Sequence, residues 1–181
     1  MKKITTVFEG LLIIEPQIFL DERGFFYESW NAELFSKLLP GVNFVQDNHS
    51  LSKHGTIRGM HYQLKKPQGK LVRVTRGNVL DVVIDLRINS KTLGETFQIE
   101  LSDKNKKMLW IPEGFAHGFQ TLSEEAEFQY KTTDYYAPSD QYCIKWNDEY
   151  LNINWANQEN LYLSKKDSSG IDYFEAPKFE F

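Results

Sequence analysis

Residues 80–87 read Leu-Asp-Val-Val-Ile-Asp-Leu-Arg, and this stretch decides the fold class. Apolar residues stand at every even position, whereas the odd positions carry two aspartates, a valine and an arginine. This period of two predicts a β-strand with one apolar face and one mixed face. The stretches 97–101 and 126–131 alternate in the same way. The chain is therefore expected to be built mainly from strands.

The segments between these runs carry turn signals, and helical signals are few. Gly77-Asn78 separates two strand-like runs and predicts a tight hairpin turn. Ser102–Asn105 predicts a polar turn. Residues 32–39 predict a short helix that ends at Pro40-Gly41. Ser164–Asp167 resembles a capping box that opens another helix.

Many short antiparallel strands with little helix favour an all-β sandwich or barrel. We expect a jelly-roll barrel with a few short helices, mainly near the C-terminus, because a propeller would need an internal repeat that the sequence lacks. A length of 181 residues favours one domain spanning 1–181.

Composition excludes several classes of protein. With 21 Lys and Arg against 25 Asp and Glu, and no basic run, nucleic acid is not an expected partner. The apolar run Leu11–Ile14 is far shorter than the ~20 residues of a membrane span. Glu9 and Glu15 bracket it and argue against a signal peptide. The single Cys143 excludes an intrachain disulfide and suits a cytoplasmic location.

Two of the four histidines stand in distinctive contexts. Pro112-x-Gly114-x-x-His117 resembles the second signature of cupin barrels, in which the histidine binds a metal. The first cupin signature would place a second histidine two residues after His61, but Gln63 stands there. Because zinc and iron sites need three or more ligands, the broken set disfavours a metal. A metal-dependent cupin, or a barrel whose histidines only hydrogen-bond the backbone, remains an alternative.

Without a metal, a histidine in a barrel can act as a base, since its ordinary pKa of ~6.5 suits proton abstraction near neutral pH. Such a base needs an orienting partner, often a carboxylate. Asp81, Asp85 and Asp167 are the candidates. Asp167 is also the fourth residue of the capping box, and that role alone would explain it.

Tyr130 shares a strand face with Phe128, so its phenol lies inside the barrel if that face does. It is then either a hydrogen-bonded core residue or a proton donor. Arg58 and Lys70 flank His61 and suit an anionic ligand such as a diphosphate, unless both are simply solvated. Strict alternation would place Arg58 and His61 on opposite faces, so we predict a bulge at Gly59.

A series of motifs, taken in order, resembles the dTDP-4-dehydrorhamnose 3,5-epimerase family from about Phe8 to Asp167. Each motif alone is weak, but their order and spacing together are specific. The motifs are Asp21–Glu28, Gln46–Ser52, Arg58–Gln63, Gln68–Val72, Asp81–Arg87, Pro112–Phe119, Tyr130-Lys131, Tyr135–Pro138 and Trp146–Asp148.

The resemblance implies a metal-free cupin jelly roll without a cofactor. It implies a homodimer with an exchanged N-terminal strand and a nucleoside-diphosphate 4-keto sugar as substrate. The chemistry would be epimerisation at C3 and C5 through an enolate. By resemblance, the catalytic positions are His61 as base with Asp167, Tyr130 as proton donor and Lys70 near the enolate. The substrate-contacting positions are Arg58, His117, Gln46, Asn48 and Lys166, with Arg23 and Glu28 reaching the nucleotide from the other subunit.

One loop departs from the family pattern. Gln141 stands where a substrate-contacting Glu is expected, and Tyr142 where a Gly is expected. Gln141 is kept as a substrate-contacting position, but the nucleotide, dTDP or GDP, and the sugar, hexose or heptose, stay open. Two alternatives also stay open: an epimerase that acts at C3 only, and a non-catalytic cupin that binds sugar nucleotides.

Overall fold

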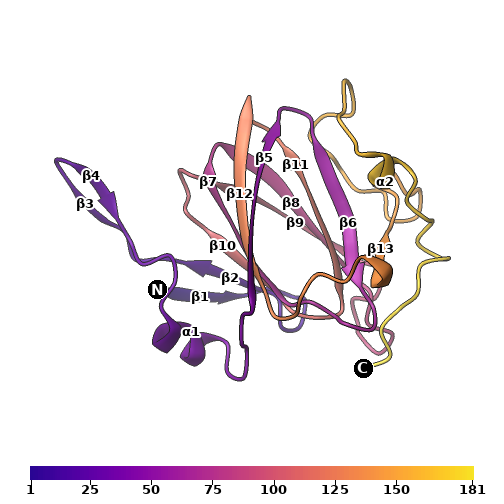
Figure 1. The fold of residues 1–181 in the computed structure, drawn as a ribbon, viewed down its shortest axis with the longest axis horizontal. Helices are drawn as coiled ribbons and strands as arrows, with labels where there is room; N and C mark the ends of the chain where they lie inside the picture. The colour runs from indigo at the N-terminus through magenta and orange to yellow at the C-terminus, as the bar shows by residue number, and fades with distance from the viewer.

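A computed structural model describes residues 1–181 and shows two antiparallel sheets that face each other as a flattened barrel (Figure 1). The six-stranded sheet has the order β1-β2-β10-β7-β12-β5, and the five-stranded sheet has the order β13-β6-β11-β8-β9. Most neighbours in space are not neighbours in sequence, which is the jelly-roll arrangement predicted from the alternating stretches.

The strands are short and the helices few, as predicted. The strands of the six-stranded sheet are β1 (Lys2–Thr5), β2 (Leu12–Glu15), β5 (Gln46–Lys53), β7 (Lys70–Arg76), β10 (Met108–Ile111) and β12 (Glu125–Thr132). Those of the five-stranded sheet are β6 (Ile57–Gln63), β8 (Asn78–Asp85), β9 (Thr96–Ser102), β11 (Phe115–Thr121) and β13 (Gln141–Cys143). A separate hairpin pairs β3 (Phe19–Asp21) with β4 (Gly24–Phe26), and the helices are α1 (Ala32–Leu38), the 3₁₀ turn η1 (Pro138–Asp140) and α2 (Lys165–Ser168).

Both faces of β8 are buried, and they face different cores. Val83 belongs to the interior cluster between the sheets, so the mixed face of 80–87 lines the barrel. Val82 and Ile84 point to the outer face of the five-stranded sheet. There they pack against residues of the C-terminal segment such as Trp155 and Phe179, and this segment runs along that side in yellow (Figure 1). The polar face of the strand therefore supplies side chains to the interior.

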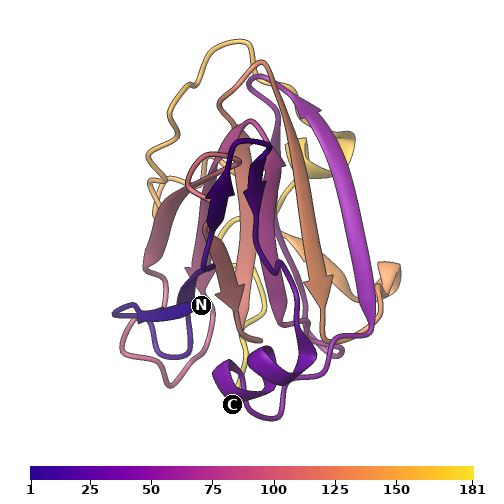
Figure 2. The ribbon, with the colours of Figure 1, turned by 90° about the vertical axis from the view of Figure 1, so that its left-hand side faces the viewer.

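Helix α1 covers the outer face of the six-stranded sheet. Asn31 caps it by accepting a hydrogen bond from the Leu34 backbone N–H, as helix N-caps commonly do. Phe35 is fully buried and packs with Ile14 and Trp110 in a third cluster. The helix sits at the lower end of the strands (Figure 2).

The predicted hairpin at Gly77-Asn78 is wrong, because β7 and β8 belong to different sheets. Gly77 has φ +74°, and its N–H donates to the Asp103 carboxylate at 2.9 Å. A Cβ at Gly77 would lie 2.2 Å from the Glu125 carbonyl oxygen. The dipeptide turns a corner from one sheet to the other. Corners and hairpins share this signature because both need a residue at positive φ.

The β3–β4 hairpin, here called the arm, extends away from the barrel (Figure 1). Its apolar side chains are exposed: Phe19 by 53%, Leu20 by 80%, Phe25 by 57% and Phe26 by 66%. A cluster of exposed apolar side chains such as this one marks an interaction site on a protein surface. None of the helices is long and apolar enough to cross a membrane.

Candidate active site

A cavity of about 470 Å³ opens into the barrel interior between the two sheets. It brings together every residue predicted for the site except Arg23 and Glu28. Its lining is Gln46, Asn48, His49, Ser50, Arg58, His61, Gln68, Lys70, His117, Phe119, Phe128, Tyr130, Tyr136, Gln141, Ser164, Lys166 and Asp167.

Asp167 is the carboxylate that orients His61. His61 Nε2 and Asp167 Oδ1 lie 2.5 Å apart, although the residues are 106 positions apart in sequence. Ser164 holds the other carboxylate oxygen with its hydroxyl at 2.7 Å and accepts from the Asp167 N–H as the N-cap of α2. Asp167 is thus both a residue of the capping box of α2 and the hydrogen-bond partner of His61. The other two candidates are engaged elsewhere, Asp81 with His117 and Asp85 with Arg87.

The environment favours a neutral imidazole beside an ionised carboxylate. Burial lowers the pKa of His61 below its ordinary value, and the hydrogen bond that His61 donates to Asp167 only partly opposes this shift. Burial alone would raise the pKa of Asp167, but hydrogen bonds from His61 and Ser164 outweigh it and lower that pKa. An ionised carboxylate can only accept, so Nε2 carries the proton and Nδ1 keeps a free lone pair.

The predicted bulge at Gly59 is confirmed. His61 pairs with His117 and Arg58 with Phe119, so β6 has one more residue than β11 across this interval. Gly59 has φ +129°, and a Cβ there would lie 2.5 Å from the Cα of Gly118. Because of the extra residue, Arg58 and His61 both line the cavity.

Three cationic side chains face the cavity. Lys70 extends from the six-stranded sheet across the interior, and its ammonium donates to the His61 carbonyl at 3.3 Å. Burial lowers the pKa of Lys70 to about 8, and the charge of Asp81 opposes that shift. Arg58 donates to the Ser52 hydroxyl at 2.9 Å, and Lys166 donates to the Gln141 amide oxygen. Because the lining carboxylate Asp167 is already paired, these cations favour an anionic ligand.

Tyr130 lines the same cavity as His61, from the opposite sheet. It lies on β12, its ring packs 6.2 Å from that of Phe128, and both rings line the cavity. Burial raises the pKa of Tyr130, with Arg58 opposing the shift, so the phenol stays protonated at neutral pH. A ligand held between β6 and β12 has an imidazole on one side and a phenol on the other.

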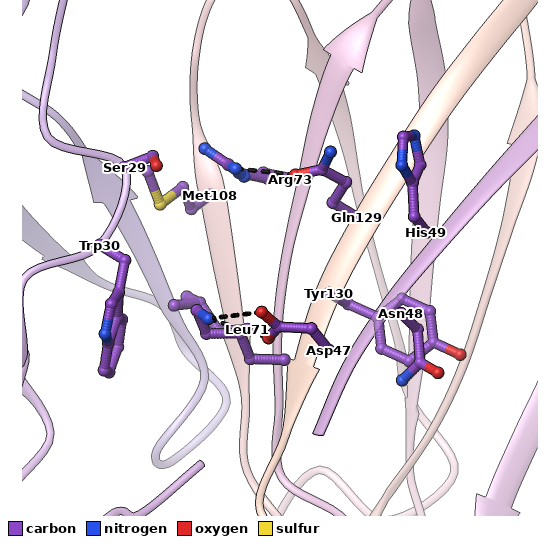
Figure 3. A pocket seen from close by; sticks show the side chains of 11 residues that line it. Ser29, Trp30, Asp47, Asn48, His49, Leu71, Arg73, Met108, Gln129 and Tyr130 are labelled. Atoms are coloured by element: carbon purple, nitrogen blue, oxygen red, sulfur yellow. Dashed lines mark hydrogen bonds and ion pairs between the residues drawn. The ribbon is translucent and has the colours of Figure 1, made fainter. Parts of the chain in front are cut away.

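A second depression, of about 310 Å³, lies on the other side of the six-stranded sheet beside Trp30 (Figure 3). Its charged groups are paired within the chain: Lys131 binds Asp47 at 2.8 Å, and Arg73 binds Gln129 at 2.7 Å. Asn48 and Tyr130 touch this depression but point away from Trp30 (Figure 3). Their functional ends therefore belong to the interior cavity.

The residues of the cupin-like signature are arranged for hydrogen bonding. His117 Nε2 lies 3.0 and 3.1 Å from the two oxygens of Asp81. Gln63 is engaged with loop backbone, since it donates to the Lys66 carbonyl and accepts from the Ala137 N–H. The group of side chains with metal-ligand atoms close together is instead His61, Cys143 and Asp167, whose atoms lie within 4.8 Å of one another.

Arg23 and Glu28 do not reach the cavity of their own chain. Arg23 lies on the arm and pairs with Asp21 at 2.6 Å, whereas Glu28 accepts from Asn31 at 2.9 Å. Sequence reasoning also missed some lining residues, notably Phe119 and Tyr136. Tyr136 is 51% exposed at the cavity mouth, and its hydroxyl donates to Gln141. Its place in the family-like motif Tyr135–Pro138 was the available signal.

Comparison with known proteins identifies the family. Residues 5–174 match the family model described as dTDP-4-dehydrorhamnose 3,5-epimerase. The chain is 49% identical over 180 residues to dTDP-4-dehydrorhamnose 3,5-epimerase of Pseudomonas aeruginosa, with 99% of each chain covered. It superposes with TM-score 0.92 on the dTDP-6-deoxy-D-glucose-3,5-epimerase of Legionella pneumophila in complex with dTDP-4-keto-L-rhamnose, at 46% identity and 99% coverage of both chains.

A more distant relative has a narrower activity. ChmJ of Streptomyces bikiniensis, a 3′-monoepimerase solved with dTDP-quinovose, is 29% identical with TM-score 0.86, covering 92% of this chain and 85% of its own. The family model covers nearly the whole chain, and the relatives match at high identity. The protein therefore belongs to the dTDP-4-dehydrorhamnose 3,5-epimerase family and is an isomerase.

Proposed function

We propose that the protein inverts C3 and C5 of a dTDP-linked 4-keto-6-deoxy sugar by proton transfer between His61 and Tyr130. The observation that carries the proposal is the placement of these two side chains on opposite sheets around one cavity. The named relatives act on dTDP sugars, which supports the same nucleotide here.

The first half of each inversion is removal of a proton. The 4-keto group acidifies the hydrogens at C3 and C5, because the resulting carbanion delocalises onto O4. Nδ1 of His61 takes the proton while Asp167 stabilises the imidazolium through Nε2. Lys70 stabilises the enolate oxygen, and one such donor is typically worth ~3–4 kcal/mol of barrier.

The second half is return of a proton to the other face. Tyr130 donates its phenolic proton to the same carbon from the opposite side, which inverts the centre. The phenolate then regains a proton from solvent while His61 loses one, so the cycle balances without a redox change. Positioned acid–base transfer contributes roughly 10²- to 10⁴-fold. The same pair serves the second carbon after the sugar shifts.

The nucleotide is held by the cations and by an aromatic ring at the mouth of the cavity. Arg58 and Lys166 bind the diphosphate in this proposal, which their cationic side chains in the cavity lining support. Tyr136 offers an exposed ring on which a base can stack, with Gln46 accepting from its backbone N–H. His117, Asn48 and Gln141 supply polar contacts along the cavity wall.

Thermal unfolding with each nucleotide tests this assignment and addresses the open choice between dTDP and GDP. A ligand at 100 times its Kd stabilises the folded state by ~2.7 kcal/mol, and dTDP should raise the melting temperature where GDP does not. A shift with GDP alone would overturn the nucleotide assignment.

The site becomes complete in a homodimer in which the arms are exchanged. The arm exposes four large apolar side chains and carries Arg23, while Glu28 follows directly after it. Strand β5, which supplies Gln46 and Asn48 to the cavity, is an edge strand and can accept a further strand. The partner subunit's arm would bring its own copies of Arg23 and Glu28 to this edge. A cytoplasmic location stays a prediction.

Deuterium exchange distinguishes the proposal from its closest alternative, an epimerase acting at C3 only, which the similarity to a 3′-monoepimerase supports. In D₂O, NMR should show deuterium at both C3 and C5. Deuterium at C3 alone would establish the narrower activity. No exchange at either carbon would leave the non-catalytic cupin, and metal analysis of the purified protein tests the metal-dependent one.

A further inference from the structure

One side-chain amide connects two hydrogen-bond donors at the mouth of the cavity. Gln141 lies on β13, at the edge of the five-stranded sheet. Its amide oxygen accepts from the Tyr136 hydroxyl at 2.9 Å and also from the Lys166 ammonium. Tyr136 lies in the loop after β12 and Lys166 lies on α2, and all three residues line the cavity. A single uncharged oxygen therefore holds a cation and a phenol that come from two other segments of the chain.

These contacts leave the charge of Lys166 uncompensated. Its ammonium donates to an amide, which has no net charge to offset it. The carboxylates next to the two residues in sequence are engaged elsewhere. Asp140 accepts from backbone N–H groups of the loop after β6 at 2.7 to 3.0 Å, and Asp167 is paired with His61. Lys166 is thus positioned at the cavity with its full charge.

We propose that Gln141 is a positioning residue that holds Lys166 at the cavity mouth without neutralising it, which keeps the ammonium charge available to the diphosphate of the nucleotide. This inference rests on the proposed binding of the diphosphate by Arg58 and Lys166. A carboxylate in place of the amide would accept the same two hydrogen bonds, but it would form an ion pair with Lys166 and repel the phosphates. The amide provides the contacts alone, and a lysine already held in place loses less freedom when the ligand binds.

Two substitutions of Gln141 separate its charge from its contacts. Gln141→Glu keeps the size and both acceptor contacts and adds a negative charge, so calorimetry should show the Kd of dTDP and of inorganic pyrophosphate rising about tenfold. Gln141→Met removes both contacts without adding charge and should raise each Kd about threefold or less. Wild-type affinity in Gln141→Glu, or an equal loss in the two variants, would overturn the proposal.

Gln129→Glu is the matched control for the added charge. The Gln129 amide oxygen also accepts from a cation, Arg73 at 2.7 Å, but in the depression beside Trp30 on the other side of the six-stranded sheet (Figure 3). This variant should leave both Kd values unchanged. A rise equal to that in Gln141→Glu would make net charge the cause and would refute a specific role for Gln141.

A double-variant comparison tests whether Gln141 acts through Lys166. In a Lys166→Met background, Gln141→Glu should raise the Kd of dTDP by a smaller factor than it does alone, because no ammonium is left to neutralise. The same factor in both backgrounds would exclude a role through Lys166. With substrate, Gln141→Glu should raise KM and change kcat by about twofold or less, since the charge acts on binding of the diphosphate. A fall in kcat at unchanged KM would contradict the proposal.

The two probes distinguish a failure of this inference from a failure of the proposed function. If the wild-type protein binds pyrophosphate but not dTDP, and the variants follow the expected order, the role of Gln141 holds and the nucleotide assignment fails. If dTDP and pyrophosphate both bind but Gln141→Glu changes neither affinity, the role of Gln141 fails and the nucleotide assignment stands. If the wild-type protein binds neither probe, both are refuted.

Discussion

His61 and Tyr130 each have an ionisation displaced in the direction that its proposed task requires. Burial lowers the pKa of His61, which keeps the base unprotonated, and raises the pKa of Tyr130, which keeps the donor protonated. One barrel interior produces both effects, because desolvation disfavours whichever form carries charge. The same burial therefore lowers the pKa of a cationic acid, the imidazolium of His61, and raises the pKa of a neutral acid, the phenol of Tyr130.

His61→Asn removes the base while leaving the diphosphate-binding cations in place. We expect exchange at C3 and C5 to fall by at least about 10²-fold, with dTDP affinity nearly unchanged. NMR in D₂O and calorimetry provide the two readings. His54→Asn is the control, since His54 is exposed and bonds the Leu122 carbonyl away from the cavity. Exchange at the wild-type rate in His61→Asn would remove this residue from the mechanism.

Tyr130→Phe separates abstraction from inversion. Without the phenol, His61 still takes the proton and returns it to the same face. Hydrogen exchange should therefore survive better than inversion, which we expect to fall by roughly 10²-fold or more. One NMR experiment in D₂O measures hydrogen exchange as the deuterium incorporated into the sugar, and inversion as the amount of epimer formed. Undiminished inversion in this variant would exclude Tyr130 as the donor.

The activity of the wild-type enzyme should have a bell-shaped pH dependence. Protonation of His61 ends base catalysis, so the acid limb lies below pH 6.5, the ordinary pKa of histidine, because burial lowers that pKa. Loss of the Lys70 ammonium sets the alkaline limb near pH 8. Lys70→Arg, which stays charged, should lose the alkaline limb when kcat is measured across the range. Its persistence would assign that limb to another group.

At the scale of elements, the bulge in β6 directs the side chains of Arg58 and His61 into the same cavity. Gly59→Ala would place a methyl group against the Gly118 backbone at a positive φ of +129°. We expect it to destabilise the fold by roughly 2 kcal/mol or more and to lower kcat by displacing His61. Thermal unfolding and kinetics check both effects.

Gly41→Ala is the control for strain alone. Gly41 has φ +80°, but an added Cβ meets no atom within 4 Å. This variant should be destabilised less than Gly59→Ala and should keep its kcat. If the two variants behaved alike, backbone strain rather than close packing in the bulge would explain the effect.

The sequence predicts the local elements well and their partners poorly. Period-two alternation identified β8, β9 and β12, because the strand backbone itself alternates its side chains. It did not reveal that β7 and β8 lie in different sheets, since Gly77 needs only a positive φ. Spacing alone could not choose Asp167 over Asp81 and Asp85, because it carries no information on contacts between distant segments. The family resemblance made that choice, and the fold shows the contact with His61.

At the scale of the whole molecule, the proposed exchange of arms means that one chain alone lacks part of its site. Co-expression of Arg23→Ala with His61→Asn tests whether arms are exchanged. In a mixed dimer with exchanged arms, one cavity combines the normal His61 of one chain with the normal Arg23 of the other, and the second cavity carries both changes. Random pairing makes half of the dimers mixed, so about a quarter of wild-type activity should return. If Arg23 served its own cavity, every site would carry a change and no activity would return. Light scattering on each variant confirms that pairing itself persists.

The C-terminal segment that covers the five-stranded sheet also carries α2 and the carboxylate that orients His61. Because a ribosome makes the chain from its N-terminus, the barrel strands emerge well before residue 167. A nascent chain can thus hold a nearly finished jelly roll whose imidazole has no partner. The His61–Asp167 pair can form only after residue 167 has been made and the tail has docked along the sheet.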